Sequence, residues 1–114
     1  HATPTKLLAV KSDLRICFVE TSEIDWVGAA DNYVELHAGK ATHLLRMTLT
    51  HLEGLLPLEQ FKRIGRSRLV NLDRVEEIRS KPHGDYEIVL KVGTVLRGSR
   101  NYRSLFDCFT RRSR

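Results

Sequence analysis

The chain has 114 residues, of which 41% are hydrophobic and 29% charged, as in an ordinary soluble domain that buries its own core. No apolar run reaches the length of a membrane-spanning helix and no signal-peptide pattern is visible, so we expect a cytoplasmic protein. The chain starts at His1 rather than Met, which suggests a piece of a longer protein.

The net charge of +5 is unevenly distributed. Residues 1–61 contain five Lys/Arg and eight Asp/Glu, a net −3, whereas residues 62–114 contain fourteen and six, a net +8. A basic half of this kind indicates a polyanionic partner, either a nucleic acid or an acidic membrane surface. A purely solubilising role for the charge is the alternative.

We expect one domain over residues 7–110, with a linker or cloning remnant at residues 1–6 and a basic tail at residues 111–114. Cys17 and Cys108 lie far apart in the sequence, each beside apolar residues. We interpret both as small apolar residues with reduced thiols, and a disulfide between them is the alternative.

The first half of the chain shows the period-2 alternation of β-strands. Leu14, Ile16 and Phe18 alternate with their neighbours, which predicts a strand that buries these three side chains. Residues 22–27 predict a further strand, with Trp26 in the core.

A hairpin follows, with strands at residues 33–37 and 41–47 on either side of the turn Ala38-Gly39-Lys40. His37 and His43 flank this turn and could face each other across the hairpin. They lack a third ligand at any recognisable spacing, so we predict no metal site and no other cofactor.

Two short helices are predicted. Thr50-His51-Leu52-Glu53 matches a capping box, in which the Thr50 hydroxyl accepts from an early backbone N–H, and Pro57 ends the helix. An amphipathic helix is predicted near the C-terminus, with Ser99 at its cap. Its apolar positions, at i, i+3, i+4 and i+7, are Tyr102, Leu105, Phe106 and Phe109.

Between the helices, alternation and turn residues predict strands at residues 75–80, 86–91 and 94–96. Together with the strands of the first half, these elements predict a mostly β domain of small antiparallel hairpins with two short helices.

The most informative stretch is Phe61–Val75, in which the four basic residues between Lys62 and Arg68 are interleaved with apolar ones. We predict a strand that ends at Ile64, an exposed turn at Gly65-Arg66-Ser67-Arg68 and a strand that begins at Leu69. Gly65 marks a bend or a close approach of another backbone. Arginine side chains on an anchored loop commonly bind phosphates and guanine edges, and a solvated charged turn is the alternative.

Several other classes of function lack a sequence signal. There is no P-loop, G-x-G-x-x-G, G-x-S-x-G or H-E-x-x-H motif, so we predict that the chain is not an enzyme and assign no catalytic residue. There is also no helix-turn-helix, zinc-finger or basic-zipper pattern. Basic side chains would therefore reach a nucleic acid from loops on a sheet scaffold.

Three sequence blocks, in this order and spacing, resemble the LytTR-type DNA-binding domain. The blocks are Ile24-Asp25-Trp26-Val27 leading to Asn32-Tyr33-Val34, the stretch from Phe61 to Ile78, and Ser99-Arg100-Asn101-Tyr102 before an apolar helix. The resemblance covers most of the chain, from about Leu7 to Phe109. It implies an elongated, sandwich-like arrangement of small β-sheets whose loops enter successive major grooves on one side of DNA.

The resemblance also implies which residues contact DNA. Base contacts fall on Asn32, Tyr33, Arg66 and Arg100. Phosphate contacts or their supports fall on Lys62, Arg63, Ser67, Arg68, Arg97 and Ser99. Asn71 and Asp73 match the family as well, and we interpret them as turn-forming residues at the far end of the basic loop.

The sequence departs from the family pattern at four positions. Gly65 stands where histidine is common, Arg68 where an aromatic residue is common, Gly28 where an acidic residue is frequent and Gly98 where a β-branched residue is frequent. These departures bear on which bases are recognised rather than on how the domain binds.

The predicted function is therefore sequence-specific binding of double-stranded DNA, as the output module of a bacterial response regulator. The resemblance further implies repeated DNA sites, a homodimer on DNA as an open alternative, and an upstream receiver or sensor domain. Two other functions stay open: a basic β module that binds RNA or an anionic membrane, and a domain whose basic face binds an acidic protein. The sequence lacks the exposed aromatic runs of single-strand stacking platforms and a basic amphipathic helix.

Overall fold

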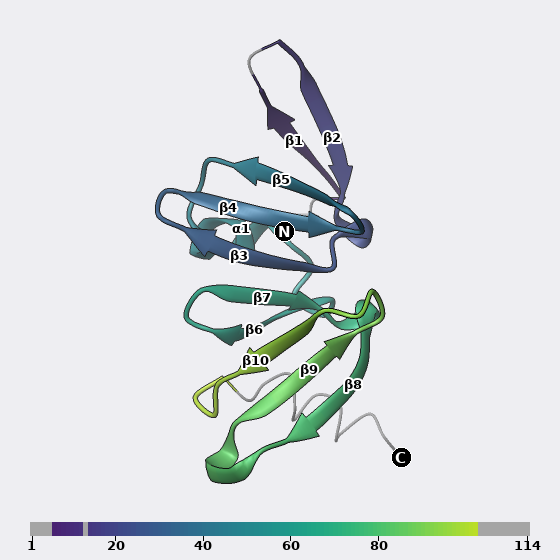
Figure 1. Cartoon of the computed structure of the whole chain (residues 1–114). Helices are drawn as coiled ribbons and strands as arrows, with labels where there is room; N and C mark the ends of the chain where they lie inside the picture. The colour runs from purple at the N-terminus through teal and green to yellow at the C-terminus, as the bar shows by residue number, and fades with distance from the viewer. Residues whose placement is uncertain (1–5, 13, 103–114) are drawn as a thin grey trace.

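The computed structural model describes residues 6–12 and 14–102. Within these residues the chain forms ten β-strands, one α-helix and three short 3-10 helices, in a body with extents of 47 × 29 × 23 Å (Figure 1). The predicted mostly β fold is confirmed, whereas the predicted helix after Tyr102 and the basic tail lie outside the described residues. No helix in the described part of the chain is long and apolar enough to cross a membrane.

Three antiparallel sheets follow one another along the long axis (Figure 1). The first is the hairpin of β1 (Leu7–Lys11) and β2 (Ile16–Glu20). The second has the strand order β5 (Ala41–Leu45), β4 (Tyr33–Ala38), β3 (Trp26–Ala30), β7 (Arg68–Asn71) and β6 (Phe61–Gly65). The third has the order β10 (Val95–Gly98), β9 (Tyr86–Leu90) and β8 (Val75–Ser80). The short helix η2 (Leu72–Arg74) connects β7 directly to β8 and so joins the second and third sheets.

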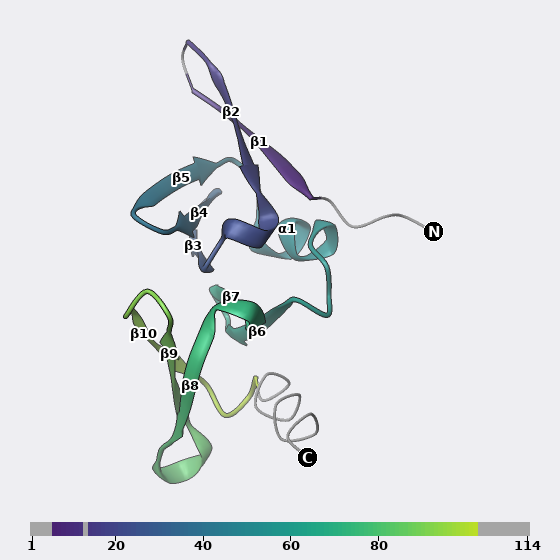
Figure 2. The ribbon, with the colours of Figure 1, turned by 90° about the vertical axis from the view of Figure 1, so that its right-hand side faces the viewer.

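Helix α1 (Leu49–Leu55) covers one face of the five-stranded sheet (Figure 2). Its N-cap is Thr48, whose hydroxyl accepts from the His51 backbone N–H at 3.1 Å. The predicted cap at Thr50 was therefore wrong, because the helix begins at the buried Leu49 and the cap must lie just before it. Thr50 instead lies in the first turn of the helix, with its side chain available to another partner.

The β1–β2 hairpin buries the opposite face from the one predicted. Leu14 is 97% exposed and Phe18 is 68% exposed, and Ile16 is also exposed. The pairing of Leu8 with Val19 puts those two side chains on the buried face, while Phe18 lies with Ala9 on the other face. Alternation predicts the strand, but a shift of one residue reverses which face is buried.

The β4–β5 hairpin turns at Gly39 and Lys40, as predicted, with Gly39 in the left-handed region (φ +63°). His37 pairs with Thr42 and His43 pairs with Leu36, so the two histidines lie on opposite faces of the sheet. The expectation that they could face each other was wrong. Among the described residues no group of three or more His, Cys, Asp or Glu side chains could hold a metal ion.

Two hydrophobic clusters form the core, one on each side of the central sheet. The first includes Phe61 and Leu69 with the leucines of α1 and the buried side of the β1–β2 hairpin. The second includes Ile64 and Val70 with the inner face of the three-stranded sheet. Cys17 on β2 is half-buried with a free thiol, and Cys108 lies outside the described residues.

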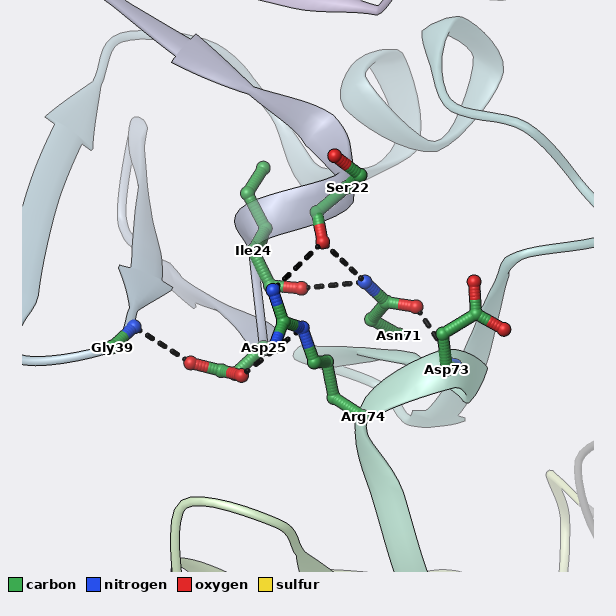
Figure 3. A network of polar contacts seen from close by, with 7 residues as sticks. All are labelled: Ser22, Ile24, Asp25, Gly39, Asn71, Asp73 and Arg74. Carbon is green, nitrogen blue, oxygen red and sulfur yellow. Dashed lines mark hydrogen bonds and ion pairs between the residues drawn. The ribbon is translucent and has the colours of Figure 1, made fainter.

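A buried asparagine fixes the junction between the second and third sheets (Figure 3). Asn71 is fully buried, and its Nδ2 donates to the Ile24 carbonyl at 2.8 Å. Its Oδ1 accepts from the Asp73 backbone N–H at 2.9 Å and thereby caps η2. The prediction that Asn71 and Asp73 form a turn is confirmed.

A second set of contacts at the same junction involves charged groups (Figure 3). Asp25 is buried, and its Oδ2 accepts from the Gly39 backbone N–H at 2.7 Å. Arg74 approaches the other carboxylate oxygen with its Nε at 3.7 Å and donates from Nη2 to the Ser22 carbonyl at 3.2 Å. These contacts, with those of Asn71, tie the segment before β3 to η2 and hold the two larger sheets in a defined arrangement.

Candidate nucleic-acid interface

Three chain segments lie at one edge of the molecule, on the left in Figure 1: the β3–β4 turn, the β6–β7 turn and the segment after β10. Backbone hydrogen bonds connect them. The Ala29 N–H, at the end of β3, donates to the Ser67 carbonyl at 2.8 Å, and the Ser99 N–H donates to the Ile64 carbonyl at 2.8 Å. The edge is therefore built from all three segments in fixed relation to one another.

The β6–β7 turn is exposed at Arg66, Ser67 and Arg68, as the sequence predicted. Its strands are anchored by buried apolar side chains on both sides, among them Ile64 and Leu69. The pairing register shifts between Arg63 and Gly65, which leaves Ile64 as the extra residue of a β-bulge. The bulge frees the Ile64 carbonyl to accept from Ser99, so the irregularity itself joins the β6–β7 turn to the segment after β10.

Arg68 lies over an aromatic ring. Its Cζ is 5.7 Å from the centroid of the Trp26 ring, within the range of a cation–π contact. Trp26 in turn stacks on His37, with ring centroids 3.9 Å apart and an interplanar angle of 4°. Gly28 lies against the Trp26 ring, since a Cβ at this position would be 3.1 Å from Trp26 Cζ3. Trp26, predicted in the core, is half-buried and also positions a basic side chain.

The segment after β10 is held by an aromatic ring and a carboxylate. A Cβ at Gly98 would lie 2.1 Å from the Tyr86 ring, so only glycine fits under this ring. The Tyr86 hydroxyl donates to the Tyr102 carbonyl. The Arg100 backbone N–H donates to Asp85 Oδ1 at 3.2 Å. Ser99 Oγ accepts from the Asn101 N–H at 3.3 Å, the start of a turn at the position where the sequence predicted a cap.

Basic side chains of the β6–β7 turn and of β10 border a single groove of about 590 Å³ between the second and third sheets. Arg66, Arg68 and Arg97 contribute three cations to its lining, and Glu35 and Asp85 contribute two carboxylates. Ser67 and Ser99 complete the polar part of the lining. Arg100 follows Ser99 directly and is exposed, with its Nη1 3.5 Å from the His83 carbonyl.

The remaining predicted contact residues are placed differently. Asn32 and Tyr33 are exposed on the β3–β4 turn, next to Asp31 in the left-handed region (φ +55°), and do not border the groove. Lys62 pairs with Val70 and therefore lies on the same face of the sheet as Trp26. Arg63 lies on the opposite face, where it donates from three nitrogens to α1 and to the backbone of the β6–β7 turn.

Sequence reasoning missed the residues that hold these segments in place. Tyr86, Asp85 and Glu53 were assigned no role at the interface, yet each contacts a segment or side chain predicted to bind DNA. The T-x-x-E pattern at Thr50 and Glu53 correctly singled out two hydrogen-bond acceptors on α1. Their side chains accept from Arg63, however, and not from the N–H groups at the start of the helix.

Comparison with known proteins places the chain in a family. The family model described as the LytTr DNA-binding domain matches residues 14–109. The sensory transduction protein LytT of Bacillus anthracis is 30% identical over 95 residues, which are 83% of this chain and 39% of that protein. LytT of Bacillus subtilis strain 168 is 30% identical over 102 residues, which are 90% of this chain and 42% of that protein. The chain thus spans about two fifths of the length of these curated relatives.

A solved LytTr DNA-binding domain from Bacillus cereus has the same fold. It superposes with a TM-score of 0.82 over 93% of this chain and 97% of that chain, at 24% sequence identity. The family model matches residues 14–109, and the fold is that of a solved member. This chain belongs to the LytTr family of DNA-binding domains.

Proposed function

We propose that this domain binds double-stranded DNA sequence-specifically, by loops that enter successive major grooves, as the output module of a bacterial transcriptional regulator. The observation that carries the proposal is the groove at the basic edge, where Arg66, Arg68 and Arg97 from two different sheets converge. A planar guanidinium can donate two parallel hydrogen bonds to a guanine edge or to a phosphate. Membership in a family of DNA-binding domains also supports the prediction that the chain is not an enzyme.

The residues divide into two roles. Arg66 and Arg100 are exposed on short segments whose backbones are anchored by other elements, which suits the reading of bases. Asn32 and Tyr33, exposed on the neighbouring turn, are proposed to contact bases of an adjacent groove. Lys62, Ser67, Arg68, Arg97 and Ser99 are proposed to contact phosphates. Arg63 was predicted to join them, but its contacts support another role, which we develop below.

The wider context comes from the relatives. The LytT proteins are named as sensory transduction proteins, and the matched region is about two fifths of their length. We infer that this domain acts with an upstream receiver or sensor domain, and that it binds repeated sites as pairs. Analytical ultracentrifugation of the domain with a duplex carrying one or two copies of its site tests the pairing.

The test of the proposal is selection of duplexes from a random-sequence library, followed by competition. We expect enrichment of a defined site, and we expect that single-stranded DNA, RNA, anionic vesicles and an acidic peptide compete weakly. Affinity should fall with salt at a log–log slope of roughly −0.9 per phosphate contacted. Better competition by one of the other polyanions, or no enriched sequence, would contradict the proposal.

A further inference from the structure

Arg63 lies on β6, three residues before Arg66, and its guanidinium has three acceptors within the protein. Its Nε donates to Glu53 Oε1 at 3.0 Å, and its Nη2 donates to Thr50 Oγ1 at 3.0 Å. Its Nη1 donates to the backbone carbonyl of Arg66 at 2.7 Å. The side chain is only 19% exposed. One side chain therefore connects helix α1 to the turn that carries Arg66.

This geometry is poorly suited to a phosphate contact. A bidentate contact requires two parallel N–H groups on one edge of the guanidinium, and Arg63 already directs a hydrogen bond from each of its three nitrogens to the protein. To bind phosphate, Arg63 would have to leave the Glu53 carboxylate, and that carboxylate would then repel the incoming phosphate. The predicted phosphate role would thus cost the contacts that shape the turn.

The neighbouring residue shows the contrast. Lys62 pairs with Val70 and faces the Trp26 side of the sheet, where the groove lies. Arg63 pairs with Leu69 and faces α1. Successive residues of a strand point to opposite faces, so only one of these two adjacent cations lies on the side of the basic groove.

We propose that Arg63 is a positioning residue, which holds the β6–β7 turn so that Arg66 can read a base. The inference rests on the proposed function, in which Arg66 is the reader. The turn is held at two successive carbonyls, that of Arg66 by Arg63 and that of Ser67 by the Ala29 N–H. A turn that is ordered before binding loses less conformational freedom on the DNA, so its arginine discriminates better between bases.

The first experiment separates position from charge with Arg63→Lys, which keeps the charge but cannot bond three acceptors in one plane. The readouts are affinity for the selected duplex, for its single-base variants and for an unrelated duplex of the same length, at two salt concentrations. We expect about a tenfold loss of preference at the position read by Arg66, with the salt slope unchanged. Lys62→Ala, the matched control, should keep base preference and reduce the slope by about one. Normal base preference in Arg63→Lys, with a reduced slope in Arg63→Ala, would identify a phosphate contact and overturn the proposal.

The second experiment removes Glu53, the acidic partner of Arg63, because electrostatics alone and the positioning role predict opposite changes in DNA affinity. Glu53→Ala removes a negative charge from a DNA-binding domain, so electrostatics alone predicts tighter binding to any sequence. The positioning role predicts severalfold weaker binding to the selected site, because Arg63 loses its carboxylate. Glu59→Ala is the matched charge control, since Glu59 is exposed and the described residues form no ion pair with it. Equal tightening in Glu53→Ala and Glu59→Ala would overturn the proposal.

The third readout needs no DNA. Exchange of the Ala29 amide hydrogen reports on its bond to the Ser67 carbonyl, and the Leu36 amide, in a strand flanked on both sides, reports on the sheet as a whole. In Arg63→Lys and Glu53→Ala we expect faster exchange at Ala29 and unchanged exchange at Leu36. Unchanged exchange at Ala29 would overturn the positioning role. If the wild-type domain selected no duplex, the proposed function would fail, and this readout would still decide whether Arg63 holds the turn.

Discussion

The two segments that carry Arg66 and Arg100 are held in place by different means. The β6–β7 turn is held by hydrogen bonds from the Arg63 side chain and from β3, and no described residue beyond its chain neighbours lies within 4 Å of a Cβ added at Gly65. The segment after β10 also has hydrogen bonds, from the Ser99 and Arg100 N–H groups, but it is fixed in addition by shape, since the Tyr86 ring occupies the space where a Gly98 side chain would be. Both arrangements fix the backbone beneath an exposed arginine.

The difference shows which kind of substitution should disrupt the segment that carries Arg66 and which the segment that carries Arg100. A turn held by hydrogen bonds loses order when a donor or acceptor is removed, even if its own backbone atoms are untouched. A segment held by packing fails when volume is added, because close-packed interiors tolerate little overpacking. The two segments can therefore be disrupted by different substitutions. Although the Ser99–Ile64 hydrogen bond links them, each disruption should mainly weaken the base preference of one arginine.

The largest expected effect comes from truncating the buried aromatic side chain at the start of β6. Phe61 begins β6, is 3% exposed and packs in the first core cluster. Phe61→Ala should lower the free energy of unfolding by roughly 3–5 kcal/mol, measured by chemical denaturation. Leu58→Ala, at a side chain that is 66% exposed, is the control and should change stability little. If Phe61→Ala stayed as stable as the wild type and yet failed to bind DNA, Phe61 would belong to the interface rather than to the core.

A smaller effect is expected at Gly98. Gly98→Ala places a methyl group 2.1 Å from the Tyr86 ring, so the ring must move and its hydroxyl must release the Tyr102 carbonyl. We expect a loss of roughly 1–3 kcal/mol in the free energy of unfolding. In the same variant, base preference assigned to Arg100 should weaken while that of Arg66 is kept. Loss of both preferences together, in a variant that is still folded, would show that the two segments are not independent.

The smallest effect is expected at Gly65, which makes the matched comparison with Gly98. Gly65 has no positive φ, and within the described part of the chain an added Cβ meets no atom within 4 Å beyond its chain neighbours. Gly65→Ala should therefore be neutral or stabilising by up to about 1 kcal/mol in the same denaturation experiment, because alanine restricts the unfolded chain. A destabilisation as large as that of Gly98→Ala would mean that the β6–β7 turn is also held by shape.

The sequence predicted the local features of the fold well. Alternation and turn residues located the hairpin at Gly39 and the exposed turn at Arg66 and Ser67, because these depend on neighbours in the chain. The buried face of β2 was predicted wrongly, since the phase of a strand is set by its pairing with β1 and by the core that it meets.

The sequence predicted which residues belong to the candidate site but not which contacts hold them in place. The resemblance named Arg66 and Arg100, whereas several of the side chains that hold their segments lie 10 to 17 residues from the groups they contact, such as Glu53 for Arg63 and Tyr86 for Tyr102. Contacts at such separations depend on how the sheets pack and leave no short-range pattern in the sequence. The bulge at Ile64 joins the β6–β7 turn to the segment after β10, and it was likewise visible only once the strand pairing was known.

The most direct test of the account is the affinity of Arg66→Ala and Arg100→Ala for the selected duplex and for every single-base variant of it, at two salt concentrations. If each arginine reads a base, each variant should lose roughly 1–3 kcal/mol of discrimination at one base position and keep the preferences at the others. The two positions should differ, because the arginines lie on different segments of the edge. A uniform loss of affinity in both variants, with every base preference intact and a smaller salt slope, would show that both arginines bind phosphates and would contradict the account.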